Sequence, residues 1–108
     1  MKKIVLPILI SVAVAVGIAT AAYAQAYGPV IRVEYRTDRA GSDIRSGYSS
    51  SFSGCLDDCA FSSNCRAFTW VKENQQPPNY NNSSPLCWLK NSVPGRRRNS
   101  GMISGVKQ

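Results

Sequence analysis

Three of the four cysteines lie close together, in the segment SFSGCLDDCAFSSNCRAFTW that runs from Ser51 to Trp70. The apolar residues of its first half recur at the spacing of one helical face, and they are Phe52, Cys55, Leu56, Cys59 and Ala60. Ser51 is a suitable N-cap, because its hydroxyl can accept a hydrogen bond from a free amide of the first turn. From Arg66 to Val71 the side chains alternate with a period of two, which predicts a strand. The segment therefore predicts a short helix that runs into a strand and carries thiols on its buried face.

The first 24 residues have the features of a bacterial signal peptide. Met1–Lys3 is positively charged, Ile4–Thr20 is uncharged and largely aliphatic, and Ala22–Ala24 is a cleavage site of the A-x-A type. A retained membrane anchor is the alternative, but the run is short for a span, Pro7 interrupts it and no charged stop-transfer cluster follows. The sequence therefore predicts a periplasmic or secreted domain, residues 25–108, that meets the membrane only during export.

The exported part is large enough for one domain only. Removing 24 of the 108 residues leaves 84, and a chain of that size buries only about 60% of its unfolded surface. Small exported domains usually compensate with disulfides, and four cysteines can supply two of them.

The exported part is also basic. Without Lys2 and Lys3, 11 of the 13 Lys and Arg residues remain against 6 acidic residues, a net charge of about +5. Outside the cytosol this charge favours acidic glycans, lipopolysaccharide phosphates or acidic protein surfaces as partners over nucleic acid.

The rest of the chain predicts an α+β arrangement of one helix and four or five short strands. The predicted strands are Val30–Tyr35, Arg66–Val71, Leu86–Lys90 and Met102–Lys107, with one short extended piece at Asp43–Arg45. Apart from that piece, Thr37–Ser50 is expected to be a loop, and Lys72–Pro85 is expected to be the longest loop. Arg96–Arg98 is expected to be an exposed basic segment.

Four cysteines allow three pairings. Cys55 and Cys59 lie one turn apart on the same helical face, a geometry that brings two sulfurs together poorly. Of the two remaining pairings, Cys59–Cys65 with Cys55–Cys87 is favoured, because the chain can turn back to the end of the helix near Cys59. On the loop-closure model these disulfides contribute about 2.4 and about 3.5 kcal/mol.

The residue types argue against metal chemistry and catalysis. The spacing C-x3-C-x5-C-x21-C lacks the paired C-x2-C knuckles of zinc sites, and there is no histidine to serve as a ligand or as a general base. The six carboxylates are scattered, and no serine lies in a G-x-S-x-G context. We therefore expect no metal, no cofactor and no enzymatic activity.

Two features are candidate binding residues. Arg96, Arg97 and Arg98, with Lys90 nearby, could hold phosphate, sulfate or carboxylate groups through bidentate hydrogen bonds, although a solvated basic loop would have the same sequence. Tyr80, with Tyr48 as a second candidate, could stack on a sugar, or could simply be an exposed tyrosine. Trp70 and Trp88 lie in predicted strands beside cysteines and are expected in the core.

These motifs together resemble the PAN/apple domain, in its small four-cysteine bacterial form. The resemblance rests on C-x3-C-x5-C-R-A-F-T-W from Cys55, C-W-L-K from Cys87, Val93-Pro94 and Ser104-Gly105-Val106. It implies a single helix packed on a curved antiparallel sheet, and the nested pairing Cys55–Cys87 and Cys59–Cys65. It also implies a non-catalytic module that binds proteins or carbohydrates. The extra cysteine pair of plasma-protein apple domains is absent from the sequence, so the partners of those domains do not carry over.

The sequence thus predicts an exported, non-catalytic binding module for a protein or glycan of the envelope or the extracellular medium, with anionic groups among its targets. The alternative is a structural or stress-related envelope protein whose basic charge gives only non-specific adhesion to anionic surfaces. Binding that depends on ligand structure favours the module, whereas binding that follows ionic strength alone favours the alternative.

Overall fold

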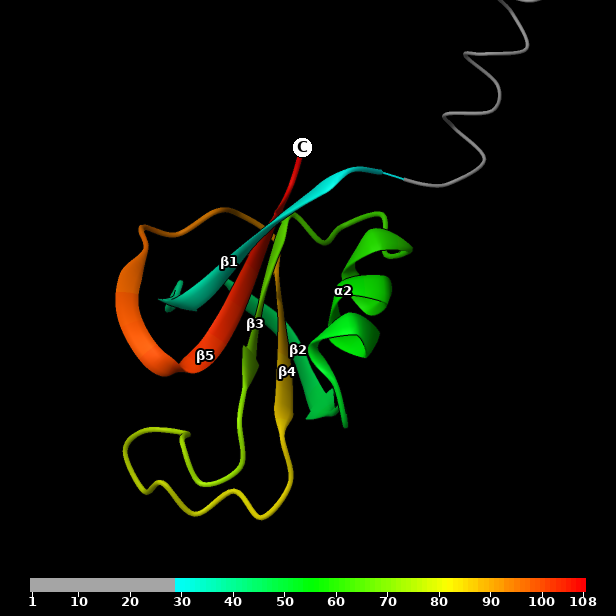
Figure 1. Ribbon diagram of the computed structural model, residues 1–108. Coiled ribbons are helices and arrows are strands. Elements are labelled where there is room, and N and C mark those ends of the chain that lie inside the picture. Colours follow the sequence, from blue (N-terminus) through cyan, green and yellow to red (C-terminus); the bar gives the residue numbers. More distant parts are fainter. Residues whose placement is uncertain (1–28) are drawn as a thin grey trace, which may run out of the picture.

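The computed structural model describes residues 29–108, which form one helix and a five-stranded antiparallel sheet (Figure 1). In chain order the elements are β1 (Ile31–Asp38), β2 (Asp43–Tyr48), α2 (Phe52–Ala60), β3 (Ala67–Val71), β4 (Leu86–Lys90) and β5 (Arg97–Lys107). The strand order in the sheet is β1-β5-β3-β4-β2. The predicted α+β fold is confirmed, whereas the predicted signal peptide, residues 1–24, lies outside the described residues and stays a prediction.

Helix α2 begins and ends where its local chemistry requires. The Ser51 hydroxyl accepts a hydrogen bond from the Gly54 amide at 3.2 Å, as expected of an N-cap. At the other end, the Phe61 amide donates to the Asp57 carbonyl at 3.0 Å. Cys55 and Cys59 are completely buried on the side of the helix that faces the sheet. Across residues 29–108, no helix has the length and apolar character needed to cross a bilayer.

Two disulfides join α2 to its surroundings. Cys55 is bonded to Cys87 in β4, with 5.4 Å between the Cα atoms, and Cys59 is bonded to Cys65 in the turn that follows the helix, with 5.2 Å between the Cα atoms. This is the pairing that the sequence favours. The first bond fixes the middle of the helix to the sheet, and the second closes the turn into β3.

The core lies between α2 and one face of the sheet. Its buried members besides the cysteines are Phe68 of β3 and Leu89 of β4, and Ile31, Leu56 and Trp70 pack against them. Phe68 is directly opposite Leu89 on one side and Gly105 of β5 on the other, so its ring extends over the backbone of β5.

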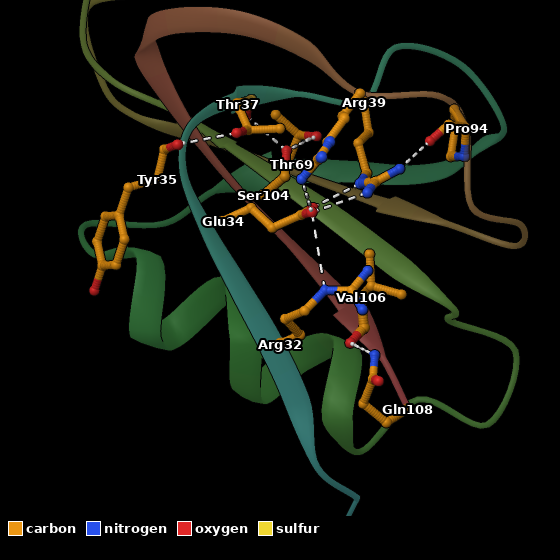
Figure 2. A network of polar contacts seen from close by, with 11 residues as sticks. Arg32, Glu34, Tyr35, Thr37, Arg39, Thr69, Pro94, Ser104, Val106 and Gln108 are labelled. Atoms are coloured by element: carbon orange, nitrogen blue, oxygen red, sulfur yellow. Dashed lines mark hydrogen bonds and ion pairs between the residues drawn. The ribbon is translucent and has the colours of Figure 1, made fainter.

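The other face of the sheet, which we call the polar face, carries a row of mostly polar side chains next to the buried Val71 and Met102. Strand pairing places Glu34, Ser104, Thr69, Trp88 and Ser46 side by side across all five strands. The Thr69 and Ser104 hydroxyls are buried 2.8 Å apart, and Ser104 Oγ donates to the Thr37 carbonyl at 2.8 Å (Figure 2). The core position expected for Trp88 is therefore wrong, because Trp88 lies on this second face and is only half-buried.

Three elements differ from the sequence-based prediction. β1 continues to Asp38, β2 extends from Asp43 to Tyr48, and β5 begins at Arg97 instead of Met102. The additional residues of β1 and β5 pair with one another, Thr37 with Arg98 and Asp38 with Arg97. Two of the three arginines that were expected in a loop are thus part of a strand, which bends strongly over its first half (Figure 1).

The close approach of Phe68 to Gly105 yields a prediction about stability. A Cβ atom at position 105 would lie 2.2 Å from Cε1 of the fully buried Phe68 ring. Gly105→Ala should therefore lower the free energy of unfolding by about 3 kcal/mol, near the upper end for overpacking a core. Urea denaturation with the disulfides intact measures this loss. Gly47→Ala in β2 is the control, since nothing lies within 4 Å of its added methyl group, and equal stability of the two variants would contradict the packing described here.

Candidate functional site

Four arginines gather where the end of β1 meets the start of β5. Arg36, Arg96, Arg97 and Arg98 line one shallow depression of about 400 Å³ together with Tyr35 and Thr37. We call these four arginines and the depression between them the basic surface. It combines the arginine run at residues 96–98 with a fourth arginine that is 60 residues away in the sequence from the first of them.

A β-bulge places Arg36 at this surface. The β1–β5 register runs from Tyr35 opposite Ile103 to Thr37 opposite Arg98, and Arg36 falls at the irregularity between them. Arg36 has a φ of 53°, in the left-handed region that costs a non-glycine residue about 1–2 kcal/mol. Bulges redirect side chains and often occur next to functional sites. The backbone here is held in an unfavourable conformation that directs an arginine out of the regular strand pattern.

The guanidinium groups of the basic surface are accessible. The side chains of Arg96 and Arg97 are 71% and 72% exposed, although Arg96 lies 3.7 Å from Glu34 and Arg97 lies 3.2 Å from Asp38. Within residues 29–108, neither Arg36 nor Arg98 has a carboxylate at ion-pair distance. Surface ion pairs of this kind are weak, so the arginines remain able to bind another anion.

One of the two carboxylates beside the basic surface, Glu34, is already paired with the buried Arg39. Arg39 donates from Nε and Nη2 to the two Glu34 oxygens at 2.7 and 2.9 Å, and its Nη1 donates to the Pro94 carbonyl (Figure 2). Both side chains are buried. The hydrogen bonds from Arg39 hold the pKa of Glu34 below its usual value. Burial acts in the opposite direction and raises this pKa, whereas the positive charges of Arg39, Arg32 and Arg96 lower it further. Glu34 thus stays ionised beneath the basic surface without cancelling its charge.

This arrangement can bind anions, because planar guanidinium groups donate paired hydrogen bonds to phosphate, sulfate and carboxylate oxygens. Four such groups around one open depression suit a ligand that presents several anionic groups. Among the described residues, no group of three or more His, Cys, Asp and Glu side chains could hold a metal ion.

Lys90 does not belong to the basic surface, which corrects the sequence-based expectation. Its ammonium group donates to Asp43 Oδ1 at 2.5 Å and to the Gly41 carbonyl at 3.1 Å, and its side chain is only 3% exposed. The cause is strand pairing, because β2 places Asp43 directly opposite Lys90 on the polar face of the sheet.

Tyr80 and Tyr48 are separate from the arginines. Tyr80 is exposed in the long loop after β3 and has a φ of 56°, and Tyr48 is exposed at the end of β2. Neither residue lines the basic surface. The role of Tyr80 as a stacking residue stays a prediction.

Sequence reasoning missed Arg36 and Arg39. The segment from Arg32 to Arg39 contains three arginines and two acids, which was a small visible excess of positive charge. That this segment lies beside Arg96–Arg98 could not be predicted from the sequence, because their proximity depends on the pairing of the first and last strands. The burial of Arg39 against Glu34 depends on the same pairing.

The Glu34–Arg39 pair yields a prediction about pH. A carboxyl group whose pKa is lowered by folding stabilises the folded state at neutral pH, and this contribution is lost as the pH falls through the lowered pKa. Wild-type protein should therefore lose stability on acidification below about pH 4.5, whereas Glu34→Gln should lose less over that range. At neutral pH the variant should be destabilised by about 3 kcal/mol, because Arg39 is left buried and unpaired.

Urea denaturation at several pH values measures both effects. Glu73→Gln is the control, since Glu73 is exposed in the loop after β3 and the substitution removes the same charge. Equal acid sensitivity of Glu34→Gln and wild-type protein would contradict the role of this pair.

A known protein family matches the part of the chain that contains the helix and the disulfides, but not the residues of the basic surface. The family model of the PAN domain matches residues 37–90, half of the chain, a segment that contains both disulfides, α2 and strands β2 to β4. Most of β1 and all of β5, with Arg36 and Arg96–Arg98, lie outside it. No curated protein matches the chain. With its one helix, its antiparallel sheet and its two disulfides, the chain belongs to the PAN domain family, whose members are generally protein- or carbohydrate-binding modules.

Proposed function

We propose that this protein is an exported, non-catalytic binding module that recognises an anionic protein or glycan of the envelope or the extracellular medium through its basic surface. The observation that carries the proposal is the convergence of four arginines from two strands around one depression. PAN domains in general bind proteins or carbohydrates, and a basic surface favours a partner that is negatively charged.

Two features of the arginines support recognition over general solubility. Arg36 is held in a left-handed backbone conformation, which costs free energy. An arginine that only increased solubility would not require this conformation. Glu34, which lies beside the arginines, is buried and bonded to Arg39, so that the exposed charges near the depression are cationic. Both features concentrate positive charge at one place on the molecule.

The proposed location rests on the chemistry of the cysteines. Disulfides persist in oxidising compartments, and both disulfides of this domain connect buried positions. Together with the charged and aliphatic start of the chain, they support a periplasmic or secreted protein. The absence of histidine from the sequence supports a role in binding.

The proposal predicts which arginines matter. Arg98→Ala should weaken binding to lipopolysaccharide or to a uronate-containing polysaccharide about tenfold, because one charge-assisted contact is lost. Arg45→Ala removes the same charge from β2, at the opposite edge of the sheet, and should leave the affinity nearly unchanged. Titration at two salt concentrations measures both affinities. If the two variants weaken binding equally, the attraction is non-specific and the alternative of loose adhesion holds.

A second variant separates binding from stability. Arg36→Gly should raise or preserve stability, because glycine adopts a φ of 53° without strain, while it weakens binding about tenfold. Asn74→Gly is the matched control, since Asn74 has a φ of 57° in an exposed turn and should leave binding unchanged. Full affinity of Arg36→Gly would remove the bulge from the binding surface.

A further inference from the structure

A second pocket lies on the polar face of the sheet, away from α2. It has a volume of about 220 Å³, and the strand residues Thr69 and Trp88 line it together with the loops that follow β1 and β3. Thr69 and Trp88 are direct neighbours across β3 and β4. The pocket touches the basic surface at one residue only, Arg97, which lines both.

The charges in this pocket balance. Two carboxylates and two cations line it as two ion pairs, Asp38 with Arg97 at 3.2 Å and Asp43 with Lys90 at 2.5 Å. An ionic ligand would lose its hydration here, and the only counter-charge open to it would be Arg97, which is exposed and also belongs to the basic surface. A hydroxyl group suits the site better, because it can donate to a carboxylate oxygen and accept from an arginine or lysine N–H.

The pocket also has an apolar side, which Trp88 and Pro77 provide above the buried side chains of Val71 and Met102. The Trp88 indole is fixed in place, since its Nε1 donates to Gln76 Oε1 at 2.8 Å. Fixed aromatic surfaces beside a few polar groups are typical of sites for small organic ligands. A sugar ring has the matching pattern, with apolar C–H groups on one face and hydroxyls around its rim.

Size and composition narrow the ligand further. Small-molecule sites usually measure about 300–1,000 Å³, so this smaller pocket suits a single ring. A metal ion is a poor alternative, because each of the two carboxylates is already paired with a cation and no third metal-binding side chain joins them among residues 29–108. We propose that this pocket is a second ligand site, which binds one uncharged sugar ring independently of the basic surface.

The two tryptophans allow a direct test. Trp70 lies on the helix side of the sheet and donates to the Ser49 carbonyl, so Trp70→Phe leaves Trp88 as the single fluorescent reporter at the pocket. The disulfide-bonded protein carrying this substitution is titrated with glucose, galactose, mannose, N-acetylglucosamine and glucuronate, and wild-type protein is titrated in parallel by calorimetry. We expect a saturable change in Trp88 fluorescence with at least one neutral sugar at millimolar concentration, and a weaker response of Trp88 to glucuronate, whose binding at the basic surface is registered by calorimetry.

Two variants locate the binding site. Asp38→Asn removes an acceptor for sugar hydroxyls, and Ala40→Leu fills the pocket without changing its charge; each should weaken neutral-sugar binding about tenfold or more. Asp57→Asn, on the exposed side of α2, is the control and should bind like wild type. Binding of the uronate-containing polysaccharide, measured in the same proteins, reports on the basic surface separately and should persist in Ala40→Leu.

Three results would overturn the proposal. They are the absence of saturable binding for all four neutral sugars, unchanged affinity in both Asp38→Asn and Ala40→Leu, and a Trp88 fluorescence response that reports tighter binding of glucuronate than of any neutral sugar. The basic surface is tested separately, through Arg36 and Arg98 and the binding of the uronate-containing polysaccharide.

Discussion

The Cys55–Cys87 disulfide is the contact on which the rest of the domain depends. It joins the middle of α2 to β4 and lies in the same small core as Phe68 and Leu89. A domain of about 80 residues cannot bury enough apolar surface to hold a helix against a sheet with much margin. The covalent bond supplies part of that stability, and the second disulfide keeps the turn between α2 and β3 closed.

Because the disulfide draws α2 to one face, the opposite face of the sheet is left without a covering helix. Loops cover it instead, and its buried polar groups form pairs: Glu34 with Arg39, Lys90 with Asp43, and Thr69 with Ser104. No buried side-chain nitrogen or oxygen among the described residues lacks a partner. Both proposed binding sites therefore lie on this face or beside the pairing of β1 with β5, whereas the largest buried cluster lies on the helix face.

Local patterns in the sequence were enough to predict the helix, its N-cap, the disulfide frame and the strands Ala67–Val71 and Leu86–Lys90. Each of these depends on residues that are near one another in the chain or on the reach of a cysteine. The first half of β5 was missed, because RRNSG has turn-forming residues and becomes a strand only through its pairing with Thr37 and Asp38. Trp88 was misplaced for a related reason: alternation in a strand identifies two faces but does not say which one the helix will cover.

The sequence by itself therefore determined that this protein is a small, basic, disulfide-linked α+β domain of the PAN family, since spacing and composition are local properties. Only the tertiary structure decided which charged side chains are exposed together and which are buried in ion pairs. Arg36 joins Arg96–Arg98 because the first and last strands are neighbours in the sheet, whereas Lys90 is withdrawn into a buried pair because β2 places Asp43 opposite it. Long-range strand pairing, which no local pattern encodes, separates an arginine that can bind a ligand from a lysine that stabilises the fold.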